Sequence, residues 1–242
     1  MNALADLRTI FQLVATPIRG ETHAERLESF YGAQAAGYDR FRERLLQGRR
    51  ELCEKLPLNP GGVWVDLGGG TGANLEFAGD RLARLAKVYV VDLSPSLLDV
   101  AQGRVRERGW SNVECAAADA TRYSPPVAAD VVTFSYSLTM IPDWFLAMER
   151  AAAMLRPGGV IGVVDFYVGR KHASAGNRRQ GWWTRTFWPT WFAMDNVFLS
   201  ADHLPYLRSR FETVECVESR AKVPYLPLGR VPYYVYVGRK RA

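Results

Sequence analysis

Five short apolar runs, separated by stretches of helical pattern, constrain the fold of this chain more than any other feature. In chain order they read GVWVDLG, KVYVVDLS, NVECAAADA, ADVVTFSYS and GGVIGVVDF. Valine-rich runs of this kind are typical of parallel strands that are buried on both faces. Ser94 before Pro95, and Pro142 with Asp143, mark the starts of two intervening helices. The alternation predicts an α/β fold with a doubly wound sheet.

The flanking segments extend this plan. Downstream, we expect a helix over 201–210 and then two strands, FETVECVES and PYYVYVGR, that pair antiparallel at the sheet edge. Upstream, apolar residues at helical spacing predict an amphipathic helix over 2–15, and a second helix is expected to run to Pro57. We therefore divide the chain into N-terminal helices over 1–57 and one domain over 58–242, with an insertion over 167–200.

Composition excludes several classes of protein. No stretch approaches the roughly 18 to 20 uninterrupted apolar residues that cross a bilayer. Asp6 and Arg8 interrupt what would be the apolar part of a signal peptide, so we expect a cytoplasmic protein. Cys53, Cys115 and Cys216 are odd in number, widely spaced and without nearby histidine, so we expect three buried, reduced thiols and no metal site.

The chain is basic, with a formal net charge of +6 and a pI near 9.3. Such a charge suits either nucleic acid or an anionic membrane surface. The helix expected over 2–15 has two corresponding interpretations, packing on its own domain or lying in a membrane interface.

A glycine loop follows the first expected strand in VDLGGGTGAN, residues 65–74. Gly68, Gly69 and Gly70 let the backbone turn sharply and let a ligand approach it closely. Gly68-x-Gly70-x-x-Ala73 also fits a dinucleotide fingerprint, so a nicotinamide enzyme is one alternative.

Acidic residues at or near the ends of the first three strands favour another cofactor. Asp66 precedes the glycines, Asp92 ends the second strand, and Asp119 with Ala120 follows the third. With LRPGG before the fifth strand, these motifs resemble the class I S-adenosylmethionine-dependent methyltransferases from about residue 63 to residue 166. The resemblance implies a Rossmann-like seven-stranded sheet with N-terminal lid helices.

The same resemblance implies a cofactor site for S-adenosylmethionine. The backbone from Gly68 to Gly70 would face the methionine moiety, Asp92 the ribose hydroxyls and Asp119 the adenine. The lid helices would add an aromatic cover and a cation for the carboxylate. The full set of implied cofactor residues is Tyr31, Tyr38, Arg42, Asp66, Gly68, Gly69, Gly70, Asp92, Leu93, Asp119, Ala120 and Ser135.

An aromatic segment, GWWTRTFWPTWFAMDNVF, occupies residues 181–198. Its tryptophans suit a membrane interface, because the large ring system sinks while its N–H stays hydrated. A mixture of tryptophan and arginine also suits stacking on single-stranded bases. The exit of the fourth strand lacks the Asn/Asp-Pro-Pro-Tyr/Phe sequence of many amide and base methyltransferases, so nucleic acid is not the expected partner.

A finer resemblance covers about residues 30–240. The sequences FSYSLTMIPDW, VVDFYVGRK, RTFWPTWF, DNVFLSADHLPYLRSRFE and KVPYLPLGRVPYYVYVGRK resemble the N-methyltransferases of betaine-lipid synthesis. The resemblance implies that diacylglyceryl-homoserine is methylated three times, downstream of a 3-amino-3-carboxypropyl transferase, by a peripheral protein on the inner face of the membrane. Trp182, Trp183, Trp188 and Trp191 would bind the interface or line an acyl groove.

The acceptor chemistry suggests further residues. Tyr136, at the end of the fourth strand, is the first candidate for orienting the amine. Asp165 would attract the ammonium and His203 would accept its proton. The substrate itself would be contacted by residues that bind its carboxylate or flank the amine: Tyr167, Arg170, Lys171, Arg185 and Tyr206.

Other functions remain open at this level. Phosphatidylethanolamine or an ornithine lipid is an alternative acceptor, and a small molecule or RNA comes next. A module that binds S-adenosylmethionine without catalysis is the remaining alternative.

Overall fold

A computed structural model describes residues 20–31, 45–173, 176, 178–193, 196–223 and 229–241. The helix expected over 2–15 lies outside these residues, as do Tyr38 and Arg42. The strands are β1 (Val63–Leu67), β2 (Lys87–Asp92), β3 (Val113–Ala117), β4 (Ala129–Ser135), β5 (Leu155–Phe166), β6 (Phe211–Lys222) and β7 (Arg230–Lys240). The helices are α2 (His23–Tyr31), α4 (Arg49–Lys55), α5 (Pro95–Arg108), α6 (Trp144–Met154), α7 (Trp182–Ala193) and α8 (His203–Arg210), with 3₁₀ helices η1 (Ala73–Arg84) and η2 (Leu138–Met140).

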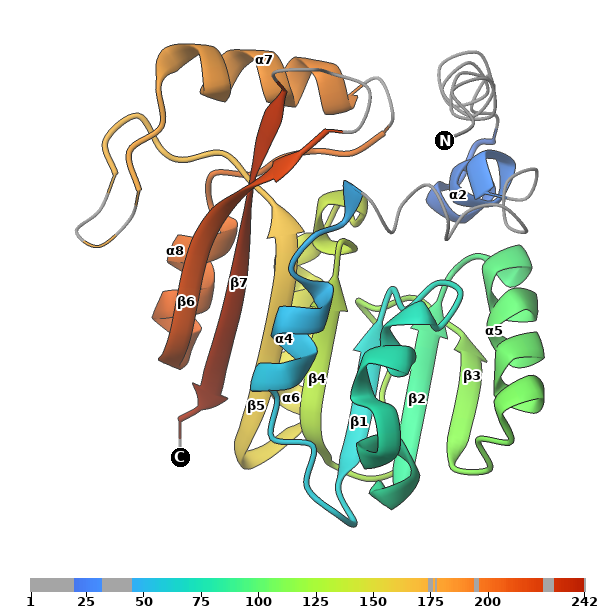
Figure 1. Cartoon of the computed structure of the whole chain (residues 1–242). Helices are drawn as coiled ribbons and strands as arrows, with labels where there is room; N and C mark the ends of the chain where they lie inside the picture. Colours follow the sequence, from blue (N-terminus) through green and yellow to red (C-terminus); the bar gives the residue numbers. More distant parts are fainter. Residues whose placement is uncertain are drawn as a thin grey trace.

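The strands form one seven-stranded sheet in the order β3-β2-β1-β4-β5-β7-β6 (Figure 1). β1 to β5 are parallel, and β7 is antiparallel to both β5 and β6. The order reverses between β1 and β4, which is where doubly wound sheets bind ligands. The predicted α/β sheet and its antiparallel edge pair are therefore confirmed.

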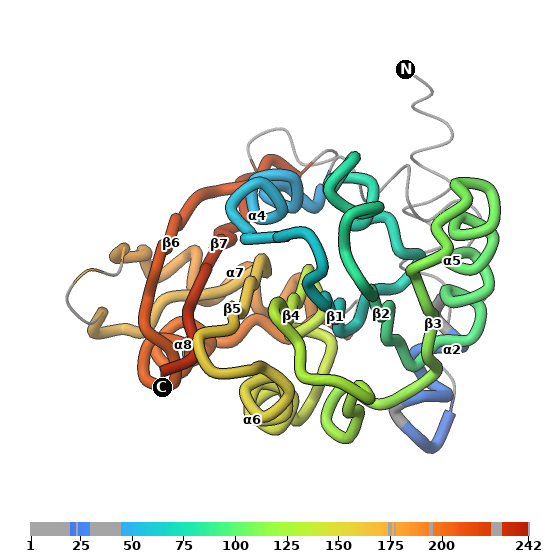
Figure 2. Tube along the Cα trace, turned by 90° about the horizontal axis from the view of Figure 1, so that it is seen from below, coloured from blue at the N-terminus to red at the C-terminus, as the bar shows by residue number. Residues whose placement is uncertain are grey.

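Helices cover both faces of the sheet. Viewed from below, α4 lies on one face, and α6 and α8 lie on the other (Figure 2). Buried side chains accordingly form two clusters, one facing α4, η1 and α5 and the other facing α6 and α8. Strand residues such as Val65, Val90 and Val132 are fully buried, as expected of strands covered on both sides.

The helix predicted to run to Pro57 is interrupted. Residues 46–48 form a turn, and α4 begins only at Arg49. Gly48 has a φ of 84°, and a Cβ there would stand 2.6 Å from the Tyr233 ring of β7. Close approach of a distant strand therefore causes the break, which local helical spacing does not reveal.

The three cysteines are unpaired, as predicted, but only Cys53 is buried. Cys115 and Cys216 are partly exposed, so the expectation of three buried thiols is wrong for these two. They lie on the edge strands β3 and β6, whose outer sides are covered less completely. Among the described residues, no helix is both long enough and apolar enough to cross a bilayer.

Candidate active site

A pocket lies at the carboxyl ends of β1, β2 and β4. Its atom-free space is about 1150 Å³, a figure that includes space open to solvent. The residues predicted from the sequence that line it are Gly68, Gly69, Gly70, Asp92, Leu93, Asp119, Ala120, Ser135 and Tyr136.

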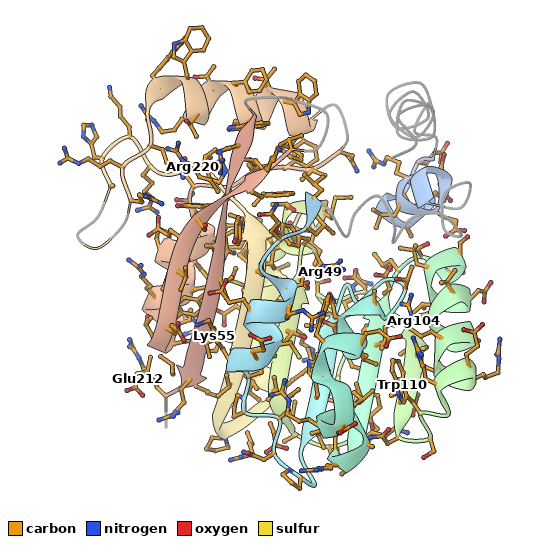
Figure 3. The ribbon with its side chains drawn as sticks, in the orientation of Figure 1. Arg49, Lys55, Arg104, Trp110, Glu212 and Arg220 are labelled. Atoms are coloured by element: carbon orange, nitrogen blue, oxygen red, sulfur yellow. The ribbon has the colours of Figure 1, made fainter. Side chains whose placement is uncertain are left out.

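The glycine loop is shaped by contacts that exclude side chains. Gly68 and Gly70 have φ angles of 67° and 55°, which favour glycine. A Cβ on Gly68 would stand 2.4 Å from the Cβ of Ser137. The N–H groups of Gly68 and Gly69 both donate to the Val91 carbonyl, and Arg104 of α5 donates to the Thr71 carbonyl (Figure 3). The loop is thus held at both ends.

Asp92 is fixed by backbone donors on either side of its carboxylate. Gly70 N lies 2.9 Å from one oxygen, and Ser94 N lies 2.9 Å from the other. Burial raises the pKa of Asp92 against the opposing effect of these hydrogen bonds. A Cβ on Gly70 would stand 3.9 Å from the carboxylate, so the absent side chain leaves space between the loop and Asp92.

The loop after β3 forms another wall. Asp119 Oδ1 accepts hydrogen bonds from Thr121 N at 2.8 Å and from Thr121 Oγ1 at 2.7 Å. These contacts hold one carboxylate oxygen within the loop. Asp119, Ala120 and Thr121 all line the pocket on the β3 side of Asp92, where the resemblance places adenine.

Asp66 lies beneath the pocket rather than in its lining. It is fully buried, and its oxygens accept from Asn74 Nδ2 at 3.0 Å and from Thr133 Oγ1 at 2.6 Å. Burial raises its pKa to about 6, against both hydrogen bonds. Asn74 does line the pocket, and its amide oxygen accepts from Ser135 Oγ at 3.2 Å. Asp66 thus orients the side-chain amide of Asn74, which links η1 to β4 through Ser135.

Helix α2, the turn over 46–48 and helix α4 supply pocket residues that the sequence did not indicate. Leu27, Leu46 and Arg49 contribute to the lining. Arg49 lies on the side of α4 that faces η1, with its guanidinium 5.5 Å from the Phe77 ring centre (Figure 3). A cation was expected near the methionine end of the cofactor, at Arg42, which is outside the described residues. In the sequence, Arg49 is one of five arginines between residues 40 and 50 and belongs to no motif.

Glu28 ties α2 to the start of α5. Its carboxylate accepts from Ser94 Oγ at 2.7 Å and from the hydroxyl of Ser96. Burial raises its pKa, but these hydrogen bonds outweigh that effect and the pKa is lowered overall. Tyr31 ends α2, and its side chain is outside the described part of the structure.

Tyr136 closes the end of the pocket nearest β5. It has a φ of 56°, rare for a bulky residue, and its hydroxyl donates to the Gln47 carbonyl at 2.5 Å. The Tyr136 and Phe166 ring centres are 4.6 Å apart. The pair places an aromatic wall between the glycine loop and the insertion.

That wall continues into α7. Phe166 lies 5.0 Å from Phe192, and Phe192 lies 6.0 Å from Trp188, measured between ring centres. We call Tyr136, Phe166, Phe192 and Trp188 the aromatic series. It joins the pocket to a helix that lies beyond the ends of β5 and β7 (Figure 1).

Two of the predicted catalytic residues do not line the pocket. Asp165 is fully buried on the α6 face and accepts from Thr139 N at 3.2 Å and from Thr139 Oγ1 at 2.8 Å. Burial raises its pKa to about 7. His203 is fully buried beside Trp144, with ring centres 4.8 Å apart. Burial lowers its pKa to about 4, and neither ring nitrogen has a hydrogen-bond partner among the described residues.

The predicted substrate residues are also dispersed. Tyr167 donates to Glu218, and Tyr206 donates to Glu149. Arg170 pairs with Asp202 at 2.6 Å. Lys171 is exposed, and Arg185 is partly buried in α7. None of these five lines the pocket as the structure describes it.

The four tryptophans of α7 divide into two pairs. Trp182 and Trp183 are exposed at 59% and 74% of their surface. Trp188 is buried, and Trp191 packs partly against the core. The sequence led us to expect these tryptophans to bind the interface or to line an acyl groove. The helix turns two of them towards solvent and two inwards.

Comparisons with known proteins agree with this geometry. Residues 65–161 match a family model described as a methyltransferase domain. The ubiquinone/menaquinone biosynthesis C-methyltransferase UbiE of Hydrogenovibrio crunogenus is 26% identical over 153 residues, covering 60% of each chain. Thus the chain spans about three fifths of the length of this curated relative.

Two solved structures share the fold. A phosphoethanolamine N-methyltransferase of Haemonchus contortus has a TM-score of 0.71 at 15% identity, covering 92% of this chain and 61% of its own. The N-methyltransferase NodS of Bradyrhizobium japonicum has a TM-score of 0.65 at 15% identity, covering 89% of this chain and 98% of its own. The chain therefore has the fold of the class I S-adenosylmethionine-dependent methyltransferases, and its residues 65–161 match a methyltransferase domain model.

Proposed function

We propose that the chain is an S-adenosylmethionine-dependent N-methyltransferase whose acceptor is the amino group of a lipid, diacylglyceryl-homoserine. The observation that carries the proposal is the aromatic series, which starts at the pocket with Tyr136 and ends in the aromatic helix α7. An aromatic face attracts an alkylated ammonium group, and an apolar wall suits the remainder of a lipid.

The pocket residues fit S-adenosylmethionine. Asp92 presents a carboxylate towards the space left by Gly70, which suits the hydroxyls of a ribose. Asp119 and Ala120 border the adenine side, and Arg49 supplies a positive charge for a carboxylate. When bound, this cofactor supplies an electrophilic methyl group.

The acceptor end must hold an amine and let its proton leave, because a protonated amine has no lone pair. Tyr136 offers its ring, and Asp143 lies in the same lining with a carboxylate that attracts an ammonium. Residues of the protein thus mainly align the amine, and a well-aligned nucleophile already removes much of the barrier. The product of a third transfer has no lone pair, so the reaction ends there.

Carbon methylation is the second candidate, because the named activity of the curated relative is C-methylation in quinone biosynthesis. That chemistry needs an acceptor that is activated by loss of a phenolic proton. An aromatic pocket wall also accommodates a ring substrate, so the two candidates are separated by experiment.

The test is mass spectrometry of lipids after the protein is incubated with S-adenosylmethionine and vesicles. One set of vesicles contains diacylglyceryl-homoserine, and others contain phosphatidylethanolamine, an ornithine lipid or a demethylated quinol. Stepwise gains of one, two and three methyl groups on diacylglyceryl-homoserine are expected. A gain on the quinol alone would replace the proposal by carbon methylation. Asp92→Ala, assayed at a low cofactor concentration, serves as the control with reduced activity.

A further inference from the structure

We propose that the outer face of α7 and the basic loop before it form a docking surface for an anionic bilayer. We define this surface as Trp182, Trp183 and Phe187 on the helix with Lys171, Arg178 and Arg179 in the loop. The inference rests on the proposed function only in that a lipid acceptor requires contact with a membrane.

The outer face of α7 is apolar and open to solvent. Trp182, Trp183 and Phe187 expose 59%, 74% and 42% of their surface, while Trp188 and Phe192 fill the inner side. Arg185 is the only charged residue in the helix. Thr186 and Thr190 are exposed beside these rings. Large aromatic side chains exposed at neighbouring positions of one helix normally mark a contact with protein or lipid.

Most of the exposed large apolar side chains lie in the two segments that follow β4 and β5. Eight large apolar residues are exposed in the described part of the chain, and six of them lie in these two segments. These six are Phe145, Leu146, Trp182, Trp183, Phe187 and Phe198. Phe145 and Leu146 lie two and three residues after Asp143 of the pocket lining. Exposed apolar side chains therefore occur close to the pocket in sequence as well as on α7.

The charge of the segment specifies the kind of surface. Residues 166–193 contain five basic residues and no acidic residue. Lys171, Arg178 and Arg179 are exposed and precede α7 in the chain. Aromatic side chains beside a row of cations are typical of helices that lie in the interface of anionic membranes.

The ring geometry favours a bilayer over nucleic acid. Trp182 and Trp183 pack edge to face, with ring centres 4.8 Å apart and an interplanar angle of 70°. Stacking on successive bases requires separate, open ring faces. A wedge of two rings in mutual contact instead suits insertion among lipid headgroups.

Sedimentation of the full chain with vesicles tests the proposal. We expect binding to vesicles of phosphatidylcholine with phosphatidylglycerol, and weaker binding to phosphatidylcholine alone. Trp182→Ala with Trp183→Ala and Phe187→Ala should weaken binding about tenfold or more, because the burial of three large apolar groups is lost. Tryptophan-to-phenylalanine changes at 182 and 183 should restore most of it.

A charge variant has a matched control. Lys171→Gln, Arg178→Gln and Arg179→Gln should weaken binding and flatten its salt dependence. The control changes the same number of charges at exposed sites on other elements, Arg84→Gln, Arg106→Gln and Arg239→Gln, and should leave binding within about twofold. Equal losses in both variants would overturn the proposal, since net charge alone would then explain binding.

Two further readouts separate this proposal from the proposed function. Calorimetric binding of S-adenosylmethionine should be unchanged in the α7 variant, which shows that it is folded. Vesicle binding without lipid methylation would overturn the function and support the surface. Two results for the α7 variant would overturn the proposal. In the first, vesicle binding is unchanged but the sedimentation coefficient of the free protein changes, so that the face contacts another copy of the chain. In the second, vesicle binding is unchanged but RNA binding is weakened, so that the face contacts nucleic acid.

Discussion

The carboxylate of Asp92 and the backbone N–H of Gly70 are joined by a hydrogen bond of 2.9 Å. This bond fixes the end of β2 against the turn after β1, so the acidic group and the glycine loop present one continuous surface. The proposed cofactor site depends on both.

Replacement of Asp92 by Ala should weaken S-adenosylmethionine binding by about 10-fold to 100-fold, because hydrogen bonds to a charged group contribute about 1.5–3 kcal/mol. Isothermal titration calorimetry measures the change. Asp99→Ala, at an exposed position of α5, is the control and should bind normally. An unaltered constant for Asp92→Ala would remove this residue from the site.

Arg49 and Arg50 provide a matched pair. Both guanidinium groups lie over the Phe77 ring, at 5.5 and 4.9 Å, but only Arg49 lines the pocket. We expect Arg49→Gln to weaken cofactor binding about tenfold and Arg50→Gln to leave it unchanged. Calorimetry with both variants decides, and a similar loss in the two would indicate an effect of the Phe77 contact instead.

Tyr136 should act through its ring rather than its hydroxyl. Tyr136→Phe keeps the ring and loses the hydrogen bond to the Gln47 carbonyl. We therefore expect near-normal methyl transfer and a free energy of unfolding that is lower by about 1 kcal/mol. Tyr136→Ala should lower kcat/KM for the amine about tenfold or more, with little change in cofactor affinity. Steady-state kinetics test this, and a larger kinetic loss in the Phe variant would instead assign the role to the hydroxyl.

His203 should make stability depend on pH. Its pKa is lowered by burial from 6.5 to about 4. The unfolded chain therefore binds more protons between these values, and stability falls as pH drops from about 6.5 towards 4, by up to about 3 kcal/mol. His203→Phe should remove this dependence in urea unfolding measured across the same range.

The same variant tests the predicted proton acceptor. Because His203 lies outside the pocket lining, we expect His203→Phe to retain methyl transfer at neutral pH. A loss of about 100-fold or more in kcat, with normal folding, would restore His203 as the general base.

The sequence predicted the sheet well because its strands are covered on both faces. Burial of both sides requires continuous apolar runs, which are visible without any knowledge of neighbours. The glycine loop and Asp92 were equally visible, since backbone turns and strand ends are local features. The break before α4 was not, because Gly48 is required by Tyr233 from the far end of the chain.

The direction of side chains was the main feature of the site that could not be predicted from the sequence. Asp165 and Phe166 are adjacent in sequence, yet the alternation of a strand sends Asp165 towards α6 and Phe166 towards Tyr136. The tryptophans of α7 posed the same difficulty, since the side of the helix that meets the core depends on how the insertion folds back. Arg49 carries no motif at all, and only the packing of α4 on η1 brings it to the pocket.

Phe192 touches both halves of the aromatic series, with Phe166 on the pocket side and Trp188 on the α7 side. A ligand that shifts the Tyr136 ring therefore works against the same packing that sets the tilt of α7. If the cofactor changes the affinity of the proposed docking surface for a bilayer, thermodynamic reciprocity requires that the bilayer change cofactor affinity by the same factor. Phe192→Leu is the substitution that should alter this coupling while leaving both surfaces chemically intact.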